Sequence, residues 1–252
     1  MLAMRLWKPP SLFFFTFHKC ASVFISRCVL QRARGLTHID HAARMFAGRS
    51  AAPTRFAPRG QLYGPLRLSA EGDVLDHLVM PALVAVRRDG VRACLMVRDP
   101  RDMLVSMFFH SRDGMALRPD LPGARKKEEE RAEAVRLEVD GYVLNTAPRF
   151  FQGCERAVQL VSDVPSIHVL RYEDMVDRWS LFEEQLQAAF DLSPRWLRTI
   201  AEESRPNDVE QPGSHKRSGA TGDHRRKLLP DTVAELTRRF EPVLRRFGYI
   251  EP

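Results

Sequence analysis

Cysteine is scarce in this sequence, and the cysteines are not spaced like those of a metal or redox site. None of the four cysteines forms a Cys-x-x-Cys pair, and no cysteine and histidine group has the spacing of a zinc site. The pattern therefore excludes zinc fingers and disulfide scaffolds, and no metal is expected. Small buried thiols in a reducing compartment are the simplest interpretation, which favours a cytoplasmic protein. The four residues are Cys20, Cys28, Cys94 and Cys154.

Long apolar runs are also missing, so no membrane span is expected. The apolar stretch near the N-terminus starts after Pro9-Pro10 and is ended by His18-Lys19, and no convincing cleavage site follows. We therefore do not expect a signal peptide. With 252 residues, of which 44% are hydrophobic, the chain can bury one large core, and we expect a single domain over residues 1–252.

Lysine is rare as well. Only six of the 39 basic residues are lysines, and arginine carries most of the net charge of +7. Arginine suits bidentate contacts with phosphate-like anions, which favours acidic partners such as nucleotides, nucleic acid, anionic glycans or membrane surfaces. A biased base composition of the genome explains the same excess, so the charge alone identifies no ligand.

Short apolar runs alternate with amphipathic segments along the chain. Buried strands are predicted at 11–17, 92–97 and 166–170, with weaker strand signals at 36–39 and 61–66. Helices are predicted at 22–34, 98–110, 179–190, 194–203 and 230–247, and another at 126–141 is expected to continue past Tyr142. Irregular structure is predicted at 42–58 and 112–125, segment 76–86 stays open between helix and strand, and 204–227 is polar and flexible. This alternation predicts an α/β fold with a parallel sheet and helices on both faces.

The first strand ends on one of the rare lysines. Lys19 follows the apolar run directly, and Ser22 opens the helix behind it. In parallel α/β sheets ligands bind beyond the carboxyl ends of the strands, where free N–H groups of a helix start favour an anion. Residues 1–34 contain no glycine, so this is not a Walker A loop. A surface lysine before a serine cap explains the same stretch equally well.

A second strand ends in the same manner, on the stretch RDPRDMLVS from Arg98 to Ser106. Asp99 is suited to cap the following helix, Pro100 fits its first position and Asp102 favours its positive end. Capping does not explain why Arg98 stands at the end of a buried strand. Arg98 and Ser106 reach one anion if the helix folds back past the strand end.

With these two junctions the sequence resembles the sulfotransferases that use 3′-phosphoadenosine-5′-phosphosulfate (PAPS). Their PKxGTTW-like loop resembles HKCASVF at residues 18–24, and their R-[DN]-P-R-D-x-x-x-S pattern is matched throughout by residues 98–106. The stretch LRYEDM at 170–175 is similar to their YED segment, and KRSGATGD at 216–223 to their RKGxxGDW segment. The four motifs follow the order of the family across about four-fifths of the chain.

The resemblance implies a P-loop NTPase-like, three-layer sandwich and a PAPS site assembled from the four motifs. It assigns the first loop to the 5′-phosphosulfate, with Phe24 in place of an adenine-stacking tryptophan, and residues 204–227 to a segment that covers the cofactor. Arg98 and Ser106 are assigned to the 3′-phosphate and Tyr172 to the adenine. The cofactor-binding residues implied are Lys19, Cys20, Ala21, Ser22, Val23, Phe24, Arg98, Ser106, Tyr172, Arg217, Ser218 and Gly219.

Three residues depart from the family pattern. Ala21 replaces a loop glycine, so the turn either avoids a positive φ or carries strain. Val23 replaces a threonine and loses one hydroxyl contact. Ser218 replaces a lysine, which weakens the grip on the 3′-phosphate unless Lys216 or Arg225 compensates.

Catalysis by such an enzyme needs a cation at the transferred group and a general base for the acceptor. Lys19 is the expected cation. The base is expected between the first loop and residue 98, and His41 or Asp40 at the end of the second strand are our candidates. His38, Glu71, Asp73 and His77 stay open as further candidates.

The implied function is transfer of a sulfuryl group from PAPS to a hydroxyl or amine, with release of 3′-phosphoadenosine-5′-phosphate (PAP). The sequence does not identify the acceptor, which is a small molecule or a carbohydrate. It leaves open whether the protein is a monomer or a homodimer. Nucleic acid is not an expected partner. One alternative is a P-loop nucleotide kinase, which requires a Walker A glycine pattern and a carboxylate for magnesium. The other is a non-catalytic polyanion binder, which requires aromatic and basic residues interleaved on one surface.

Overall fold

The computed structural model of the chain describes residues 8–46, 55–73, 75–87, 90–114, 124–205 and 219–251. Its centre is a five-stranded sheet in the order β2-β3-β1-β4-β5, in which all four strand pairs are parallel. The strands are β1 (Leu12–Thr16), β2 (Thr37–Ile39), β3 (Gln61–Arg67), β4 (Arg92–Val97) and β5 (His168–Arg171). The predicted parallel α/β sandwich is confirmed.

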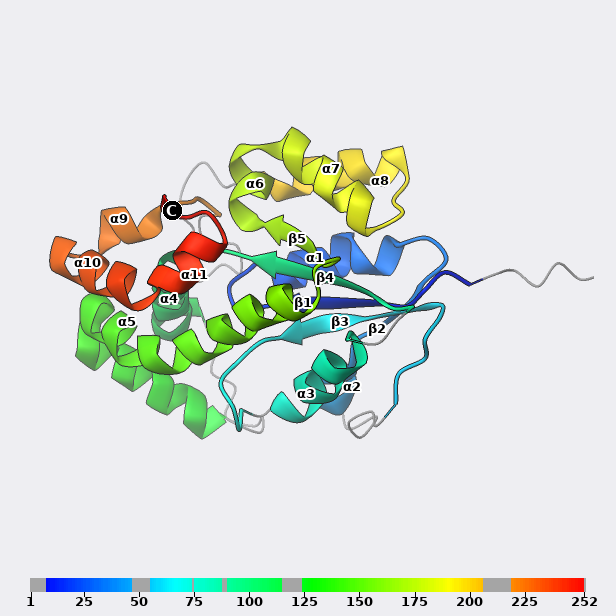
Figure 1. The fold of residues 1–252 in the computed structure, drawn as a ribbon. Helices are drawn as coiled ribbons and strands as arrows, with labels where there is room; N and C mark the ends of the chain where they lie inside the picture. The colour runs from blue at the N-terminus through cyan, green and yellow to red at the C-terminus, as the bar shows by residue number, and fades with distance from the viewer. Residues whose placement is uncertain are drawn as a thin grey trace, which may run out of the picture.

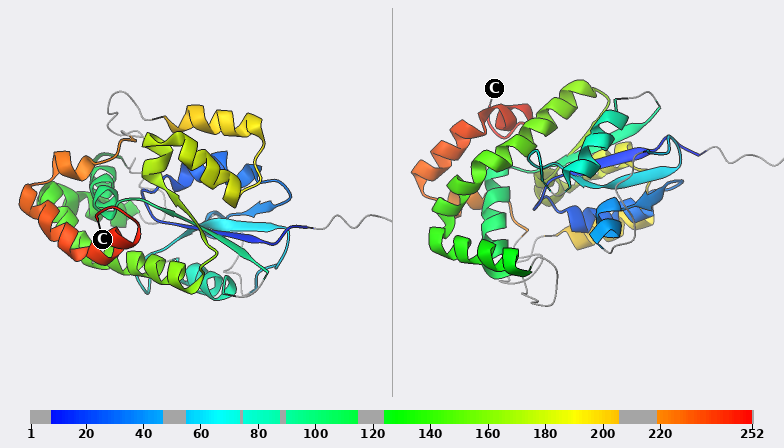
Figure 2. Two further views of the ribbon diagram at one scale, coloured as in Figure 1. Left: turned by 45° about the horizontal axis from the view of Figure 1, so that its top comes forward. Right: turned by 90° about the horizontal axis from the view of Figure 1, so that it is seen from below.

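Helices cover both faces of this sheet and close its carboxyl edge. They are α1 (Ser22–Cys28), α2 (His41–Phe46), α3 (Asp76–Ala85), α4 (Pro100–Phe109), α5 (Ala124–Asp163), α6 (Tyr172–Asp177), α7 (Trp179–Ala189), α8 (Pro194–Ser204), α9 (Asp223–Lys227), α10 (Pro230–Arg239) and α11 (Glu241–Arg246). Helices α1, α7 and α8 lie over one face, and α3 with the second half of α5 lies over the other (Figure 1). Helices α4, α9 and α10 gather beyond the carboxyl ends of the strands (Figures 1 and 2).

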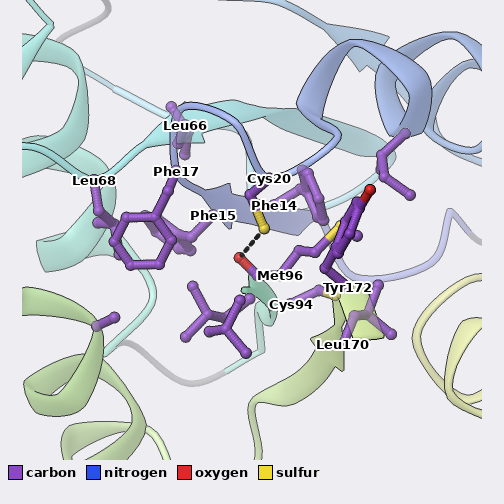
Figure 3. Close-up of a cluster of buried hydrophobic side chains, with 14 of the residues drawn as sticks. Phe14, Phe15, Phe17, Cys20, Leu66, Leu68, Cys94, Met96, Leu170 and Tyr172 are labelled. Carbon is purple, nitrogen blue, oxygen red and sulfur yellow. Dashed lines mark hydrogen bonds between the residues drawn. The ribbon is translucent and has the colours of Figure 1, made fainter. Parts of the chain in front are cut away.

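The strands form where apolar residues run without alternation, because both faces of the sheet are covered. All five residues of β1 are buried, and Figure 3 shows its Phe14 and Phe15 in one cluster with residues of β3, β4 and β5. Burial of each such ring contributes about 2–3 kcal/mol to folding. The carboxyl end of β1 is therefore fixed against its neighbours, and the loop that follows starts from a rigid point.

Several predicted boundaries were wrong, for local reasons. The helix predicted at 22–34 ends at Cys28 and continues only as a short 3₁₀ turn, η1 (Leu30–Arg32). The closing helix is two helices, α10 and α11, because Pro242 near the start of α11 has no N–H to continue the first one. Residues 42–46, predicted to be irregular, belong to α2.

Three further segments can be compared with the prediction. Helix α5 extends to Asp163, in line with the expected continuation past Tyr142, because buried residues such as Ala147 and Cys154 continue its packed face; its backbone leaves helical geometry at Glu138, with φ 53°. The segment 76–86, left open, is helix α3. The start of the predicted loop at 112–125 belongs to a π-helical turn, η2 (His110–Gly114), while residues 115–123 lie outside the described residues.

Candidate functional site

The two strand ends singled out by the sequence lie side by side. Thr16 ends β1 and Val97 ends β4, the strand paired with it. One residue beyond Val97, the Nη1 group of Arg98 donates a hydrogen bond to the Lys19 carbonyl oxygen at 3.0 Å. The first loop and the RDPRD motif are thus joined directly, through a charged donor and a backbone acceptor.

The first loop turns through the left-handed region twice. Lys19 has φ 63° and Ala21 has φ 49°, so Ala21 does carry the strain that a glycine would avoid. Cys20 between them points into the core, where its Sγ donates to the Met96 carbonyl oxygen at 3.4 Å (Figure 3). Burial raises the pKa of this thiol to about 12. Cys20 can therefore offer a ligand only its backbone.

Helix α1 begins immediately after this turn. Its first helical bond runs from the Ile25 N–H to the Ala21 carbonyl oxygen, so the N–H groups of Ser22, Val23 and Phe24 precede the ladder. Ser22 is buried, and Val23 and Phe24 are half-buried. The residues that the resemblance assigns to the 5′-phosphosulfate are thus neighbours on one turn.

Arg98 joins three motifs. Besides the Lys19 carbonyl, its guanidinium donates to the Ala220 carbonyl oxygen at 3.3 Å and lies 4.2 Å from the centre of the Tyr172 ring. Burial opposes its charge, but Tyr172, Asp102 and Glu173 raise the pKa of Arg98 above its usual value. Its Nε is buried and has no partner among the described residues. A buried guanidinium with a spare donor fits an anionic ligand.

The segment beginning at Gly219 is held over this arginine at three points. The Tyr172 hydroxyl donates to the Gly219 carbonyl oxygen at 2.6 Å, and Arg98 holds Ala220. The Asp102 carboxylate accepts from the Gly222 N–H at 2.7 Å. Arg217 and Ser218, assigned by the resemblance to the same segment, lie outside the described residues.

The remaining charges of the RDPRD motif have structural partners. Asp99 caps α4 by accepting from the Arg101 N–H at 2.9 Å, as predicted, and its carboxylate also pairs with the Arg101 guanidinium at 2.7 Å. Arg101 reaches on to the Thr237 hydroxyl at 2.8 Å. Ser106 is half-buried two turns along α4, and its hydroxyl makes no hydrogen bond within the described residues. Within the motif, the Arg98 Nε and the Ser106 hydroxyl are thus the groups that have no partner among the described residues.

Arg67 is a further candidate site residue, which the sequence analysis did not name. It ends β3 beside Thr16 of β1, and its Nη2 donates to the Ser22 hydroxyl at 3.3 Å. Burial lowers the pKa of Arg67, with Asp40 opposing, and no carboxylate lies within ion-pair distance of its guanidinium among the described residues. A desolvated charge without a counter-ion is costly unless an anion supplies one. The available signal was an arginine at the carboxyl end of a third buried strand.

The two candidate bases, Asp40 and His41, follow β2, which is shorter than its neighbour β3. The last residue of β2, Ile39, pairs with Tyr63, and β3 continues from Tyr63 for four more residues, about 13 Å, before it reaches Arg67. The His41 ring stacks on the Tyr63 ring with 5.8 Å between centres, and both ring nitrogens are buried without partners. Burial lowers the pKa of His41. Asp40 caps α2 by accepting from the Ala43 N–H at 2.8 Å.

The further candidate bases are scattered. His38 shares a 2.7 Å hydrogen bond with the Gly64 carbonyl oxygen, and Asp73 forms an ion pair with Arg149. Glu71 and His77 are exposed. Within the described ranges no group of three histidine, cysteine, aspartate or glutamate residues is placed to hold a metal ion. No helix in the described parts of the chain is long and apolar enough to cross a membrane.

Comparison with solved structures shows which proteins have a similar fold. Over 95% of this chain and 85% of the other, the structure matches the mouse sulfotransferase SULT7A1 complexed with PAP, with a TM-score of 0.52 and 14% identity. Retinol dehydratase in a complex with retinol and PAP matches 98% of this chain and 84% of its own, with a TM-score of 0.52 and 14% identity. The sequence alone matches no protein-family model and no curated protein. The chain therefore has the sulfotransferase fold, and the expected P-loop-like architecture is confirmed.

Proposed function

We propose that this protein is a PAPS-dependent sulfotransferase. The main support for this proposal is the position of Arg98, which contacts the Lys19 carbonyl, the Ala220 carbonyl and the Tyr172 ring. These contacts gather the four motifs of the family around one buried cation. A bisphosphorylated nucleoside with an anion at each end suits such a site, because cations at two neighbouring strand ends neutralise the two anions separately.

The residues present fit the nucleotide. Arg98 and Ser106 would hold its 3′-phosphate, with the segment at Gly219 closing over it; Arg217 and Ser218 are proposed members of that segment. Tyr172 and Phe24 would border the adenine. Lys19, Ser22 and Arg67 would hold the 5′-phosphosulfate, together with the N–H groups of the loop.

PAPS supplies an activated sulfuryl group, and the chain's part is to position it and stabilise charge. Lys19 and Arg67 stand at the ends of adjacent strands and would neutralise the charge that gathers on the leaving 5′-phosphate. The buried thiol of Cys20 takes no part, because its pKa is raised to about 12. The acceptor carries a hydroxyl or amine, and the carbohydrate and small-molecule classes both fit this chemistry.

Calorimetric titration with PAP tests this proposal. We expect micromolar binding by the wild-type protein and a loss of about a hundredfold in Arg98→Ala, since a charged hydrogen-bond donor to a phosphate contributes about 1.5–3 kcal/mol. Arg92→Ala is the matched control, because Arg92 begins the same strand at the opposite edge of the sheet. A preference for ATP with magnesium would instead indicate a kinase, and equal, salt-sensitive binding of PAP and heparin a polyanion binder.

A further inference from the structure

Two carboxylates lie next to Arg98, and neither forms an ion pair with it. Asp102 lies in the first turn of α4. The Glu173 carboxylate accepts a hydrogen bond at 2.9 Å from the N–H of Asp99, the residue that follows Arg98. Burial alone would lower the pKa of Arg98, and both carboxylates, together with Tyr172, raise it. Within the described residues, however, the guanidinium contacts only two backbone carbonyls and the Tyr172 ring, so its charge has no carboxylate as a direct counter-ion.

Both carboxylates are instead held by other hydrogen-bond donors. The two oxygens of Asp102 accept from backbone N–H groups at the start of α9. In Glu173, Oε1 accepts from the Asp99 N–H and Oε2 accepts from the Tyr249 hydroxyl, each at 2.9 Å. Each oxygen of Glu173 thus has a donor, and the second donor is a side chain that belongs to none of the four motifs.

The chain reverses after α11 and brings Tyr249 to this carboxylate. Gly248 adopts a left-handed φ of 69°, which a residue with a Cβ avoids. Its N–H donates to the Arg245 carbonyl oxygen at 3.2 Å, and the Tyr249 N–H donates to the Leu244 carbonyl oxygen at 2.8 Å, which is the Schellman pattern of a helix end. Arg171, at the end of β5, donates to the Gly248 carbonyl oxygen at 3.3 Å and lies 4.6 Å from the centre of the Tyr249 ring. The tyrosine is therefore fixed through its backbone, its ring and its hydroxyl.

We propose that Tyr249 is a positioning residue of the cofactor site, whose hydroxyl keeps the Glu173 carboxylate from pairing with Arg98. This inference rests on the proposed function. A carboxylate and a phosphate bind a guanidinium through the same kind of two-oxygen contact, so they compete for one arginine. Because Glu173 is held by its two donors, the charge of Arg98 stays available to the 3′-phosphate of the nucleotide.

A tyrosine that served stability alone would behave differently. Its hydroxyl would contribute to the unfolding free energy, and any effect on nucleotide binding would be the same whether or not residue 173 carried a charge. In the positioning role, the effect on binding needs both the charge of Glu173 and the guanidinium of Arg98. A double-mutant cycle separates the two cases, because it measures whether the effect of one substitution depends on another.

Calorimetric titration with PAP supplies this measurement. Tyr249→Phe should weaken PAP binding about fivefold or more, because the released carboxylate oxygen competes for Arg98. In a Glu173→Gln or an Arg98→Ala background the same change should alter the affinity by less than about twofold, because the competing charge or its target is missing. Tyr63→Phe is the matched control. The Tyr63 hydroxyl accepts from the Ala57 N–H at 2.7 Å, in the amino half of β3, and its loss should leave PAP affinity unchanged.

Glu173→Gln alone gives a second measurement, which does not depend on Tyr249→Phe. It should bind PAP at least as tightly as the wild type, because the competing charge is gone and an acceptor oxygen for the Asp99 N–H remains. Urea unfolding shows that each compared variant is folded. Unchanged PAP affinity in folded Tyr249→Phe, an equal loss in the Glu173→Gln background, or weaker PAP binding by Glu173→Gln itself would overturn the proposal. A wild-type protein that does not bind PAP would instead refute the proposed function.

Discussion

Asp102 of α4 and His224 of α9 form a buried pair that ties the segment beginning at Gly219 to helix α4. The Nδ1 atom of His224 lies 2.6 Å from Oδ1 of Asp102, and the same oxygen accepts from the His224 N–H at 2.9 Å. The other oxygen accepts from the Gly222 N–H at 2.7 Å. The second aspartate of RDPRD thus stabilises the start of α9, whereas the sequence suggested that it serves its own helix.

This pair predicts a specific loss of stability in acid. Burial disfavours the Asp102 carboxylate, but hydrogen bonds from His224 and the charge of Arg98 outweigh it and lower its pKa to about 2 from 3.8. When the pKa of a carboxyl group is lower in the folded than in the unfolded protein, its charge stabilises the fold at pH values above the unfolded-state pKa. This stabilisation is lost as the pH falls through the folded-state pKa. The difference corresponds to about 2 kcal/mol at neutral pH.

Urea unfolding of wild type and Asp102→Asn measures the contribution of Asp102 to stability. The contributions of the other carboxylates cancel when the unfolding free energies of the two proteins are subtracted. Between about pH 5 and pH 3 we expect the wild type to lose about 1 kcal/mol more unfolding free energy than the variant. At neutral pH the variant should be the less stable of the two. Parallel pH curves for the two proteins would contradict the shift.

Ala21 offers a stabilising substitution. Its φ of 49° costs a residue with a Cβ about 1–2 kcal/mol, which glycine avoids, while glycine adds about 0.4–1 kcal/mol of unfolded-state entropy. Ala21→Gly should therefore raise the unfolding free energy by about 0.5–1 kcal/mol. Ala43→Gly, in helix α2, is the control and should lower it. A destabilised Ala21→Gly would show that the left-handed turn is not adopted in solution.

The sequence predicted which strands end on basic residues better than it predicted where helices and strands begin and end. Apolar runs ending on Lys19 and Arg98 marked two strand ends, and parallel strands necessarily bring such ends to one edge. It did not point to Arg67 as a candidate site residue, because β3 contains Gly64 and Pro65 and gives a weak strand signal. Nor did it reveal where His41 lies. His41 follows the end of β2, and the length of β2 depends on its pairing with β3 and not on its own residues.

The His41 ring packs against two aromatic side chains. Its two nitrogens are buried beside Tyr63 and Phe56 without partners, which is costly, and an apolar ring of similar size removes that cost. We expect His41→Phe to raise the unfolding free energy by about 1 kcal/mol and to keep turnover within threefold. Asp40→Asn keeps the α2 cap acceptor and should behave similarly in turnover. Loss of turnover in either variant would restore that residue as a candidate base.

The hydroxyl of Tyr172 predicts a link between the YED segment and cofactor binding. Tyr172→Phe removes the 2.6 Å hydrogen bond to the Gly219 carbonyl and releases one anchor of the segment over Arg98. We expect about a fivefold loss of PAP affinity, since one hydrogen bond contributes about 1 kcal/mol. Tyr142→Phe removes a similarly buried hydroxyl, 3.2 Å from Ser111, and should lower stability without changing PAP affinity. Equal PAP affinities in the two variants would exclude this link.

Lys19 allows binding and catalysis to be separated. Its carbonyl, not its side chain, accepts from Arg98, so Lys19→Ala leaves the bridge between the two junctions in place. We therefore expect PAP affinity to fall less than tenfold and turnover to fall about a thousandfold, because the removed ammonium acts on charge that develops only during transfer. Lys8→Ala, an exposed lysine before β1, is the control and should match wild type in both measurements. If Lys19→Ala loses binding and turnover in equal measure, the ammonium grips the nucleotide in the ground state, and the stabilisation of transfer must come from Arg67.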